Sequence, residues 1–258
     1  MKISIIIATY NAQKRLGRCL DSILSQKTDD VELIIIDGGS KDQTCSIIED
    51  YKSIVDYSIS EKDDGIYHAW NKGVKIAKGD WIMFLGADDC LTPGAIRKIM
   101  QYLSSINYDE CDYVSAKINY LDEQGQLIKI IGKAWCWMEF RNKMTVAHVG
   151  SLHSRMLFNE IGLFDTNYKI CADYELLMRK KENLRACFMN EVIASMEFGG
   201  VSLSTAAIYE TLKICNTYSN NNLIVKLYLL IRKLSEFYFF LFRYRIIRIF
   251  SIKQRVLE

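Results

Sequence analysis

Residues 81–90 read WIMFLGADDC, an apolar run that ends on two adjacent aspartates. Trp81 to Leu85 contains nothing that favours water, so the run predicts a strand buried on both faces. Asp88 and Asp89 then place two negative charges side by side where the chain leaves the core. Such a pair costs free energy unless a cation lies nearby, because like charges disfavour ionisation of each other. We therefore expect this strand end to hold a cation.

Apolar runs of this kind alternate with helical patterns through the first hundred residues. The expected strands are ISIIIATY (3–10), VELIIID (31–37), YSIS (57–60) and WIMFLG (81–86). The expected helices are the stretch 16–24, DQTCSIIEDY (42–51), GIYHAWNKGVKIAKG (65–79) and TPGAIRKIMQYL (92–103). This alternation predicts βαβ units and a largely parallel sheet that is covered on both faces. In the last helix we expect Thr92 to cap and Pro93 to occupy the first helical position.

The rhythm changes after residue 112. DYVSAKINYLDEQGQLIKIIG (112–132) predicts two strands joined by a turn at Glu123–Gly125. We then expect a helix near ADYELLMRKKEN (172–183), a strand over 186–202 and a helix over 205–219. No linker separates the two halves, so residues 1–221 are expected to form one α/β domain, divided into 1–112 and 113–221.

Charge and cysteine usage exclude several classes of protein. The net charge of +2 argues against a general nucleic-acid binder. The charge is uneven, because residues 222–258 hold eight basic and two acidic residues, which leaves the preceding part negative. The eight cysteines form no CxxC pair and no zinc-ligand spacing, and the chain opens without a secretory signal. These features predict free thiols in the cytoplasm.

The residues that follow the expected strands point to a ligand site. Ligands of open α/β sheets bind beyond the carboxyl ends of the strands. Those ends carry Thr9-Tyr10-Asn11, Asp37-Gly38-Gly39-Ser40 and Asp88-Asp89. Carboxylates suit Mg²⁺ or Mn²⁺, which are commonly held by one or two of them together with substrate phosphates. Each motif alone is equally compatible with an ordinary turn, so the prediction of a divalent cation bridging to a diphosphate depends on their coincidence.

Four stretches in order resemble the family 2 glycosyltransferases, namely SIIIATYN (4–11), ELIIIDGGSKDQT (32–44), DDGIYHAWNKGVKIAKGDWIMFLGADD (63–89) and GLFDTNYKICADYELLMR (162–179). The resemblance covers about residues 1–200. It implies the GT-A fold, inversion at the transferred sugar, and a nucleotide-sugar donor, usually a UDP-sugar. Residues 1–112 then become the donor-nucleotide half and residues 113–221 the acceptor half.

The same resemblance implies roles for individual residues in the donor-nucleotide half. Thr9, Tyr10 and Asp37 match positions that contact the nucleoside, with Asp37 facing the base. Asp88 matches the position toward the ribose and Asp89 the ligand of a Mn²⁺ or Mg²⁺ ion. Polar residues of the family also line the donor pocket where this chain has Asp64, Asn71 and Lys72, although helix capping and a solvated surface explain these almost as well.

The acceptor half supplies the expected catalytic base. Asp173 matches the base of the family's ED motif, whereas Ala172 stands where the family often has Glu. Inversion needs one base to take the proton of the acceptor hydroxyl. Without the resemblance, Asp173 is equally well explained as a helix N-terminal residue favoured by the dipole. Of His148 and His153, we expect one to touch acceptor or pyrophosphate and the other to be structural.

The segment 222–258 predicts a basic amphipathic helix. Its charged residues recur on one helical face, opposite Leu, Ile, Tyr and Phe side chains that include FYFFLF (237–242). No uncharged window approaches the ~20 residues that span a bilayer. We expect the helix to lie in a membrane interface; the alternative is a helix that packs its apolar stripe on the body. The residues on the charged face are Lys226, Arg232, Lys233, Glu236 and Arg243.

These features together predict a sugar transferase attached to the cytoplasmic face of a membrane. The expected acceptor is a lipid-linked saccharide in the assembly of a bacterial surface polysaccharide, such as O-antigen or capsule, by family habit. Two alternatives stay open. A sugar-nucleotidyltransferase would carry a glycine-rich basic loop after the first strand, which ATYNAQKRLG (8–17) does not supply. A non-catalytic carbohydrate-binding subunit would have no need of the four retained aspartates.

Overall fold

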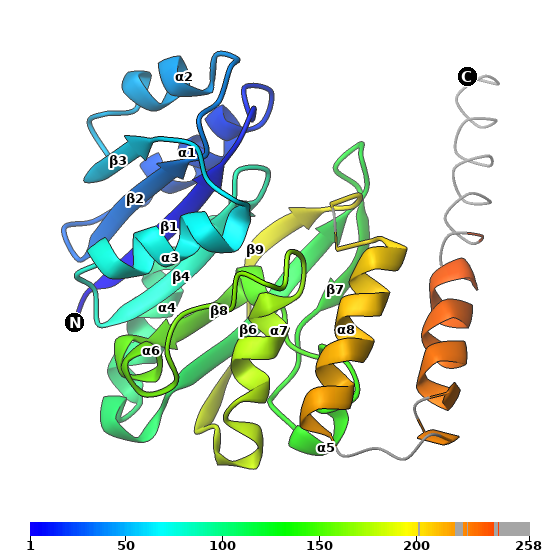
Figure 1. The fold of residues 1–258 in the computed structure, drawn as a ribbon. Coiled ribbons are helices and arrows are strands. Elements are labelled where there is room, and N and C mark those ends of the chain that lie inside the picture. Colours follow the sequence, from blue (N-terminus) through cyan, green and yellow to red (C-terminus); the bar gives the residue numbers. More distant parts are fainter. Residues whose placement is uncertain (201, 220–223, 226, 240–241, 243–258) are drawn as a thin grey trace, which may run out of the picture.

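The computed structural model describes residues 1–200, 202–219, 224–225, 227–239 and 242, and its centre is a mixed sheet (Figure 1). In the described residues the sheet has nine strands, in the order β3-β2-β1-β4-β8-β6-β9-β5, with β7 paired to β6. The strands are β1 (Ile3–Thr9), β2 (Val31–Asp37), β3 (Tyr57–Ser60), β4 (Trp81–Gly86), β5 (Cys90–Leu91), β6 (Tyr113–Leu121), β7 (Leu127–Ile131), β8 (Ser151–Ser154) and β9 (Ala186–Glu197).

The sheet divides into a parallel half and a mixed half. Strands β3, β2, β1 and β4 run parallel to one another, as the alternating pattern predicts. Strand β8 then pairs antiparallel with both β4 and β6, and β6 pairs parallel with β9. The expected hairpin over 112–132 is confirmed as β6 and β7, whose turn is closed by a bond from Gly125 N to Asp122 O of 3.0 Å.

Helices cover both faces of the sheet, which gives the mixed α/β architecture of the GT-A fold. One face packs against α1 (Leu16–Leu24), α2 (Thr44–Asp50) and α4 (Ala95–Ser105). The opposite face, toward the viewer in Figure 1, packs against α3 (Ile66–Ile76), α5 (Trp137–Phe140), α6 (Arg155–Ile161), α7 (Ala172–Met178) and α8 (Thr205–Tyr218).

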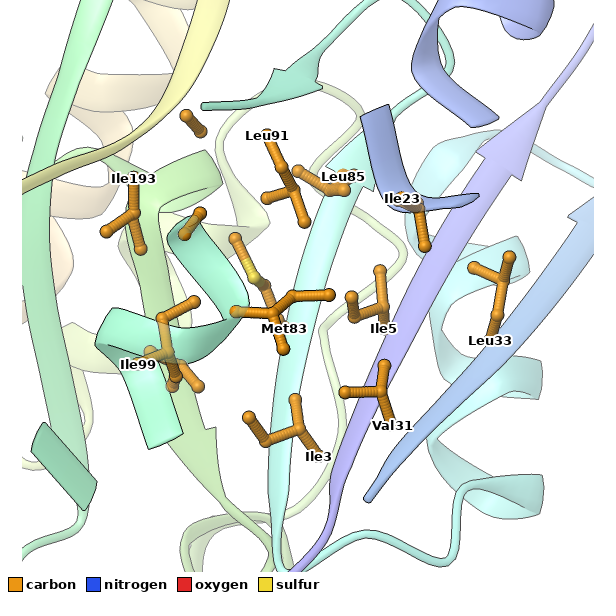
Figure 2. Close-up of a cluster of buried hydrophobic side chains, with 14 of the residues drawn as sticks. Ile3, Ile5, Ile23, Val31, Leu33, Met83, Leu85, Leu91, Ile99 and Ile193 are labelled. Atoms are coloured by element: carbon orange, nitrogen blue, oxygen red, sulfur yellow. The ribbon is translucent and has the colours of Figure 1, made fainter. Parts of the chain in front are cut away.

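The apolar runs explain why the central strands are buried on both faces. In β4, Met83 and Leu85 enter the cluster under α1 and α4, whereas Ile82 and Phe84 enter the cluster under α3 and α6. Figure 2 shows the first cluster, where Met83 lies among side chains of β1, β2 and α4. Successive side chains of a strand point to opposite faces, so an uninterrupted apolar run satisfies two cores at once. The expectation for residues 81–86 is confirmed.

The start of α4 corrects one expectation. Thr92 does not cap this helix, and Pro93 is not its first residue: α4 begins at Ala95, after Gly94 in the left-handed region with φ 73°. The Thr92 hydroxyl instead donates to the carbonyl of Val192 at 2.9 Å. The side chain is therefore used to hold the short strand β5 beside β9. The expected strand over 186–202 likewise ends early, at Glu197.

A buried carboxylate joins the first residues of the mixed half. Asp112, 1% exposed, accepts bonds from Arg185 Nε (3.1 Å) and Arg185 N (3.2 Å), and Lys180 Nζ lies 3.5 Å away. Burial acts to raise the pKa of Asp112, but the bonds from Arg185 outweigh it and hold the pKa below its usual value. The carboxylate is therefore ionised and fixes the beginnings of β6 and β9 relative to each other.

We predict that Asp112→Ala lowers the free energy of unfolding at pH 7 by about 2–4 kcal/mol, because it leaves the half-buried Lys180 with only an exposed partner. Glu160→Ala removes that exposed partner and should cost less than about 1 kcal/mol. A lowered carboxylate pKa contributes stability above its unfolded value of about 3.9 and loses it as the pH falls through the folded value. Denaturant titrations should therefore show the Asp112→Ala deficit shrinking below about pH 4. A deficit that persists there would contradict the assignment.

Candidate active site

The ends of three parallel strands bring the expected donor-binding residues to one edge of the sheet. Thr9 is in register with Asp37 at the ends of β1 and β2, and Ala8 is in register with Gly86 at the end of β4. The loops that follow therefore leave the sheet side by side. The edge is the position at which open α/β sheets bind their ligands.

Asp37 is a carboxylate whose bonding positions are filled by the protein. Oδ1 accepts from the hydroxyls of Thr9 (2.9 Å) and Ser40, and Oδ2 accepts from Ser60 Oγ (2.6 Å), Gly39 N (3.1 Å) and Ser40 N (2.9 Å). The turn that supplies these donors needs Gly39, which has φ 80°. Burial acts to raise the pKa of Asp37, but the bonds from Ser40, Ser60 and Thr9 lower it overall. Asp37 is thus an ionised side chain that organises the turn.

The carboxylates of Asp88 and Asp89 lie in an environment opposite to that of Asp37. A Cβ on Gly86 would lie 2.8 Å from both Asp88 Oδ1 and Asp89 Oδ2, so the two side chains fold back together over the strand end. Asp89 is 4% exposed and accepts one bond, from Gly86 N at 2.8 Å. Burial first, and then the charge of Asp88, raises the pKa of Asp89 to about 8. No cation of the described residues forms an ion pair with either carboxylate; Arg18 pairs with Glu197 instead.

The described residues contain no group of three or more His, Cys, Asp or Glu side chains arranged as a metal site. At the strand ends, the described residues offer a cation the two carboxylates above Gly86. This donor set fits Mg²⁺ or Mn²⁺, which complete their coordination with water and substrate phosphate. The two carboxylates at this strand end therefore have the chemistry of a site in which the cation binds together with the ligand.

Two adjoining hollows open beside these strand ends. The first, of ≈ 420 Å³, is lined by Thr9, Tyr10, Gly38 and Asp63, among others. The second, of ≈ 570 Å³, shares Ala8, Tyr10 and Ile66 with it. Tyr10 is 64% exposed and lies between them. The further residues that line the second hollow include Asn11, Lys14, Arg15, Asp42, Asp88 and Gly200.

Asp173 lies in the first turn of α7 and does not line either hollow. Tyr67 Oη lies 2.9 Å from Asp173 Oδ1 and 2.6 Å from the carbonyl of Ile170. Tyr67 belongs to α3, whose first residue Ile66 lines both hollows. A buried tyrosine thus fixes the half-buried carboxylate to the helix that borders the cleft.

Two of the residues expected in the donor pocket lie elsewhere. Asn71 is buried and uses its side chain to bind Phe164 N (3.0 Å) and Phe164 O (2.9 Å), so it is absent from the lining of both hollows. Asp64 is also absent from the lining, and its backbone N–H donates to His68 Nδ1 at 3.1 Å. Lys72, the weaker candidate, forms an ion pair with Glu61 at 2.8 Å. The neighbouring Asp63 takes the expected place, with its carboxylate against Gly38.

The two histidines belong to an aromatic cluster between the halves. His148 stacks on Phe84 with centroids 5.3 Å apart and lies 4.9 Å from Trp70, and His153 contacts Phe84 edge-on. Burial lowers the pKa of both imidazoles, so both are neutral at pH 7. Neither lines the two hollows. The ring contacts and the burial therefore support a packing role for both imidazoles.

The residues that sequence reasoning missed are basic. Lys14 and Arg15 follow the first strand and line the second hollow, and Lys62 lines the first. A signal was available, because two consecutive basic residues in NAQKRLG (11–17) follow directly on the strand end that already carried the ligand prediction. The position of Gly200, brought to the second hollow by the end of β9, had no such signal.

Comparison with known proteins identifies the family of this chain. A family model described as glycosyl transferase family 2 matches residues 4–162. A PGL/p-HBAD biosynthesis glycosyltransferase of Mycobacterium tuberculosis is 32% identical over 206 residues, which cover 77% of this chain and 78% of that protein. An uncharacterised glycosyltransferase of Bacillus subtilis, YwdF, is 30% identical over 190 residues, with 72% and 70% covered.

Solved structures share the fold at lower identity. TarS of Staphylococcus aureus, residues 1–349 in complex with UDP-GlcNAc, superposes with a TM-score of 0.67 at 18% identity, covering 91% of this chain and 72% of that one. The mannosyltransferase PcManGT of Pyrobaculum calidifontis, in complex with GDP-Man and Mn²⁺, gives a TM-score of 0.65 at 16% identity, covering 86% and 65%.

Proposed function

The chain belongs to glycosyl transferase family 2, and from this premise we propose that it transfers a sugar, with inversion, from a nucleoside diphosphate sugar to a hydroxyl of a saccharide acceptor. The observation that carries the proposal is the meeting of three strand ends and two carboxylates without a cation at one cleft, beside the helix α3 whose Tyr67 holds Asp173. The family match leaves the nucleotidyltransferase alternative without support, and the four retained aspartates speak against a non-catalytic subunit.

We place the nucleoside in the first hollow. Thr9 and Gly38 line it, Asp37 lies buried beside them, and Tyr10 offers an exposed ring at its boundary with the second hollow. Because Asp37 is saturated, it could accept a base N–H only when the hydroxyl of Ser40 or Ser60 rotates away. A UDP-sugar is the donor we favour, and the UDP-GlcNAc complex of TarS supports that class of donor for the shared fold. Asp63 then takes the role that was expected of Asp64.

The diphosphate belongs in the second hollow, beside Asp88, Lys14 and Arg15. Asp88 lines that hollow and Asp89 lies behind it, so both would hold a Mn²⁺ or Mg²⁺ ion, with Asp88 as the more accessible ligand. The bound ion would neutralise charge that develops on the leaving diphosphate, which removes the need for a protein acid. Lys14 adds positive charge to the same hollow without a metal, whereas Arg15 is already paired with Glu197.

Asp173 is the base in this proposal. Its carboxylate takes the proton of the acceptor hydroxyl as the oxygen attacks the anomeric carbon from the face opposite the diphosphate. Tyr67 orients the carboxylate by its contact with Oδ1. The missing Glu of the ED motif, here Ala172, is compatible with this role because Ala172 is fully buried and faces the core.

We further propose that the acceptor is lipid-linked and that the enzyme works at the cytoplasmic face of a membrane, in surface polysaccharide assembly. The residues described as helical at 224–225, 227–239 and 242 are called the C-terminal helix here. No helix among the residues that the structure describes is long and apolar enough to cross a bilayer. One side of the C-terminal helix nevertheless exposes large apolar side chains, each more than half exposed: Ile224, Leu227, Tyr228, Ile231, Tyr238, Phe239 and Phe242.

These seven side chains, called the outer stripe here, recur at helical spacing and fit an anionic lipid surface. The segment 222–258 carries a net charge of +6, and each basic residue near such a surface contributes about 1 kcal/mol. Lys226 and Arg243, expected on the charged face, lie outside the described residues. An interfacial helix of this kind needs no spanning segment.

The first prediction of this proposal concerns the base. Asp173→Asn should bind UDP as the wild type does, while kcat falls by roughly 10²-fold or more, because the near-isosteric amide cannot take a proton. Tyr67→Phe keeps the carboxylate and should lose less, roughly tenfold, by loosening its orientation. UDP release from a panel of UDP-sugars, measured with lipid-linked acceptors and Mn²⁺, gives both values. Activity of Asp173→Asn within a few-fold of wild type would place the base elsewhere.

A second prediction tests the two carboxylates separately. Asp88→Asn and Asp89→Asn should each reduce the Mn²⁺-dependent gain in UDP affinity by about tenfold or more, the effect of losing one charged contact. Asp42→Asn is the matched control, because Asp42 lines the same hollow without facing the pair. Calorimetric titration of UDP with and without Mn²⁺ measures the gain. If both variants keep the full gain, the metal assignment is refuted.

The third prediction tests the outer stripe without truncating the chain. Tyr238→Ser combined with Phe239→Ser should weaken binding to anionic vesicles by roughly tenfold or more, because two half-exposed rings no longer enter the interface. The control is Ile130→Ser combined with Tyr209→Ser, two equally exposed apolar residues on the body. Co-sedimentation with phosphatidylglycerol-containing vesicles gives the comparison. Equal binding of the two double variants would remove the membrane role of the stripe.

A further inference from the structure

A third hollow lies on the acceptor half, away from the strand ends, between the hairpin, α8 and the C-terminal helix. Its volume is ≈ 380 Å³, within the range of small-molecule sites. We propose that this hollow binds the phosphate and the first part of the chain of an anionic amphiphile, the lipid end of the acceptor. This assignment rests on the proposed transferase function. The residues that carry it are Tyr120, Lys129, Ile208, Thr211, Lys233 and Phe237.

Positive charge is the first feature of this hollow. Lys233 lies on the inner side of the C-terminal helix and faces the body, opposite the outer stripe. Among the described residues no carboxylate forms an ion pair with it, because the nearby Glu236 is bound by Arg232 Nε at 2.9 Å. Lys129 enters from β7, with Nζ 5.5 Å from the centroid of the Tyr120 ring. The hollow thus presents the Lys233 ammonium group, with the positive charge of Lys129 nearby and a Glu236 carboxylate that is already bound by Arg232.

Burial leaves the Lys233 ammonium short of solvation. Desolvation is the main influence on this side chain and lowers its pKa, against the opposing effects of the Cys215 thiol and Glu236. A half-buried ammonium without an ion-pair partner gains most from a bound anion.

One wall of the hollow is apolar. Ile131 and Met196 come from the sheet, Leu203 from the loop after β9, and Phe237 from the C-terminal helix. An inorganic anion would make no use of these side chains. A phosphate that carries a hydrocarbon chain uses both parts of the hollow, the Lys233 ammonium group for the phosphate and the apolar wall for the first methylene groups.

The place of the hollow in the fold suits an acceptor. Thr211 lines it and lies 3.6 Å from Cys171 Sγ, two residues before Asp173. Ser202 and Leu203 line it as well, two or three residues after Gly200, which lines the hollow assigned to the diphosphate. A saccharide joined to a phosphate held by Lys233 therefore starts close to both the base and the donor.

The outer stripe explains how such a ligand would arrive. A C-terminal helix that rests in the membrane interface with its apolar side down puts its inner side, with Lys233, just above the headgroups. Lipid phosphates lie at that level. The hollow would then take a phosphate from the interface, and the chain would remain in contact with the bilayer.

The test measures binding of decyl phosphate to the full chain by calorimetry, below its micelle concentration. Inorganic phosphate and decyl glucoside test the two halves of the ligand alone. Lys233→Met keeps the length of the side chain and removes the charge, and Lys75→Met makes the same change on an exposed helix position far from the hollow. Ile208→Trp fills the hollow from α8 without changing the charge.

We expect decyl phosphate to bind wild type and Lys75→Met alike, and both hollow variants at least about tenfold more weakly, the effect of losing a charge-assisted bond or the space for the chain. Inorganic phosphate and decyl glucoside should each bind at least about tenfold more weakly than decyl phosphate. Unchanged affinity in Lys233→Met, or equal affinity for inorganic phosphate, would overturn the proposal. UDP titration of the same samples serves as the folding control and keeps this outcome separate from a failure of the transferase proposal.

Discussion

The in-register pairing of β1 with β2 and β4 is the constraint on which the rest of the molecule depends. Parallel strands in register end at the same level, so the loops after Thr9, Asp37 and Gly86 emerge at one edge without any contact between their sequences. A slip of one residue would also turn each apolar side chain to the other face of the sheet, and both cores would lose their partners. The burial that stabilises the fold is therefore the same burial that aligns the site.

The edge holds two carboxylates, Asp37 and Asp89, that differ in whether the protein itself supplies their hydrogen-bond donors. Asp37 is supplied with hydroxyl and backbone donors by its own loop, and its pKa is lowered. Asp89 has one backbone donor and a second carboxylate beside it, and its pKa is raised to about 8. Folding alone supplies the hydrogen bonds that the Asp37 carboxylate needs. The Asp89 carboxylate stays unfavourable in its ionised form until a cation binds. Local bonding thus separates a structural aspartate from one that awaits a ligand.

The sequence predicts the parts of this molecule that depend on local pattern, and misses those that depend on contacts between distant segments. Uninterrupted apolar runs are enough to predict the strands 31–37 and 81–86, and therefore the edge at which Asp37 and Asp88 lie. Asn71 was misjudged because its partner, the Phe164 backbone, is remote in the chain. The Thr92 hydroxyl also has a remote partner, because it donates to the carbonyl of Val192. The contact between Tyr67 and Asp173 likewise joins two segments that are far apart in the chain.

The C-terminal helix is apolar on two sides. Its inner side buries Leu229 and places Phe237 and Lys233 at the third hollow, and Lys233 has no ion-pair partner in the described part of the chain. Its outer side presents the seven apolar side chains of the outer stripe. Turning the helix about its axis would only exchange one apolar side for the other, so the exposed side gains free energy only from a further partner. A lipid surface supplies such a partner, because its hydrocarbon boundary takes the outer stripe and its phosphates match Lys233.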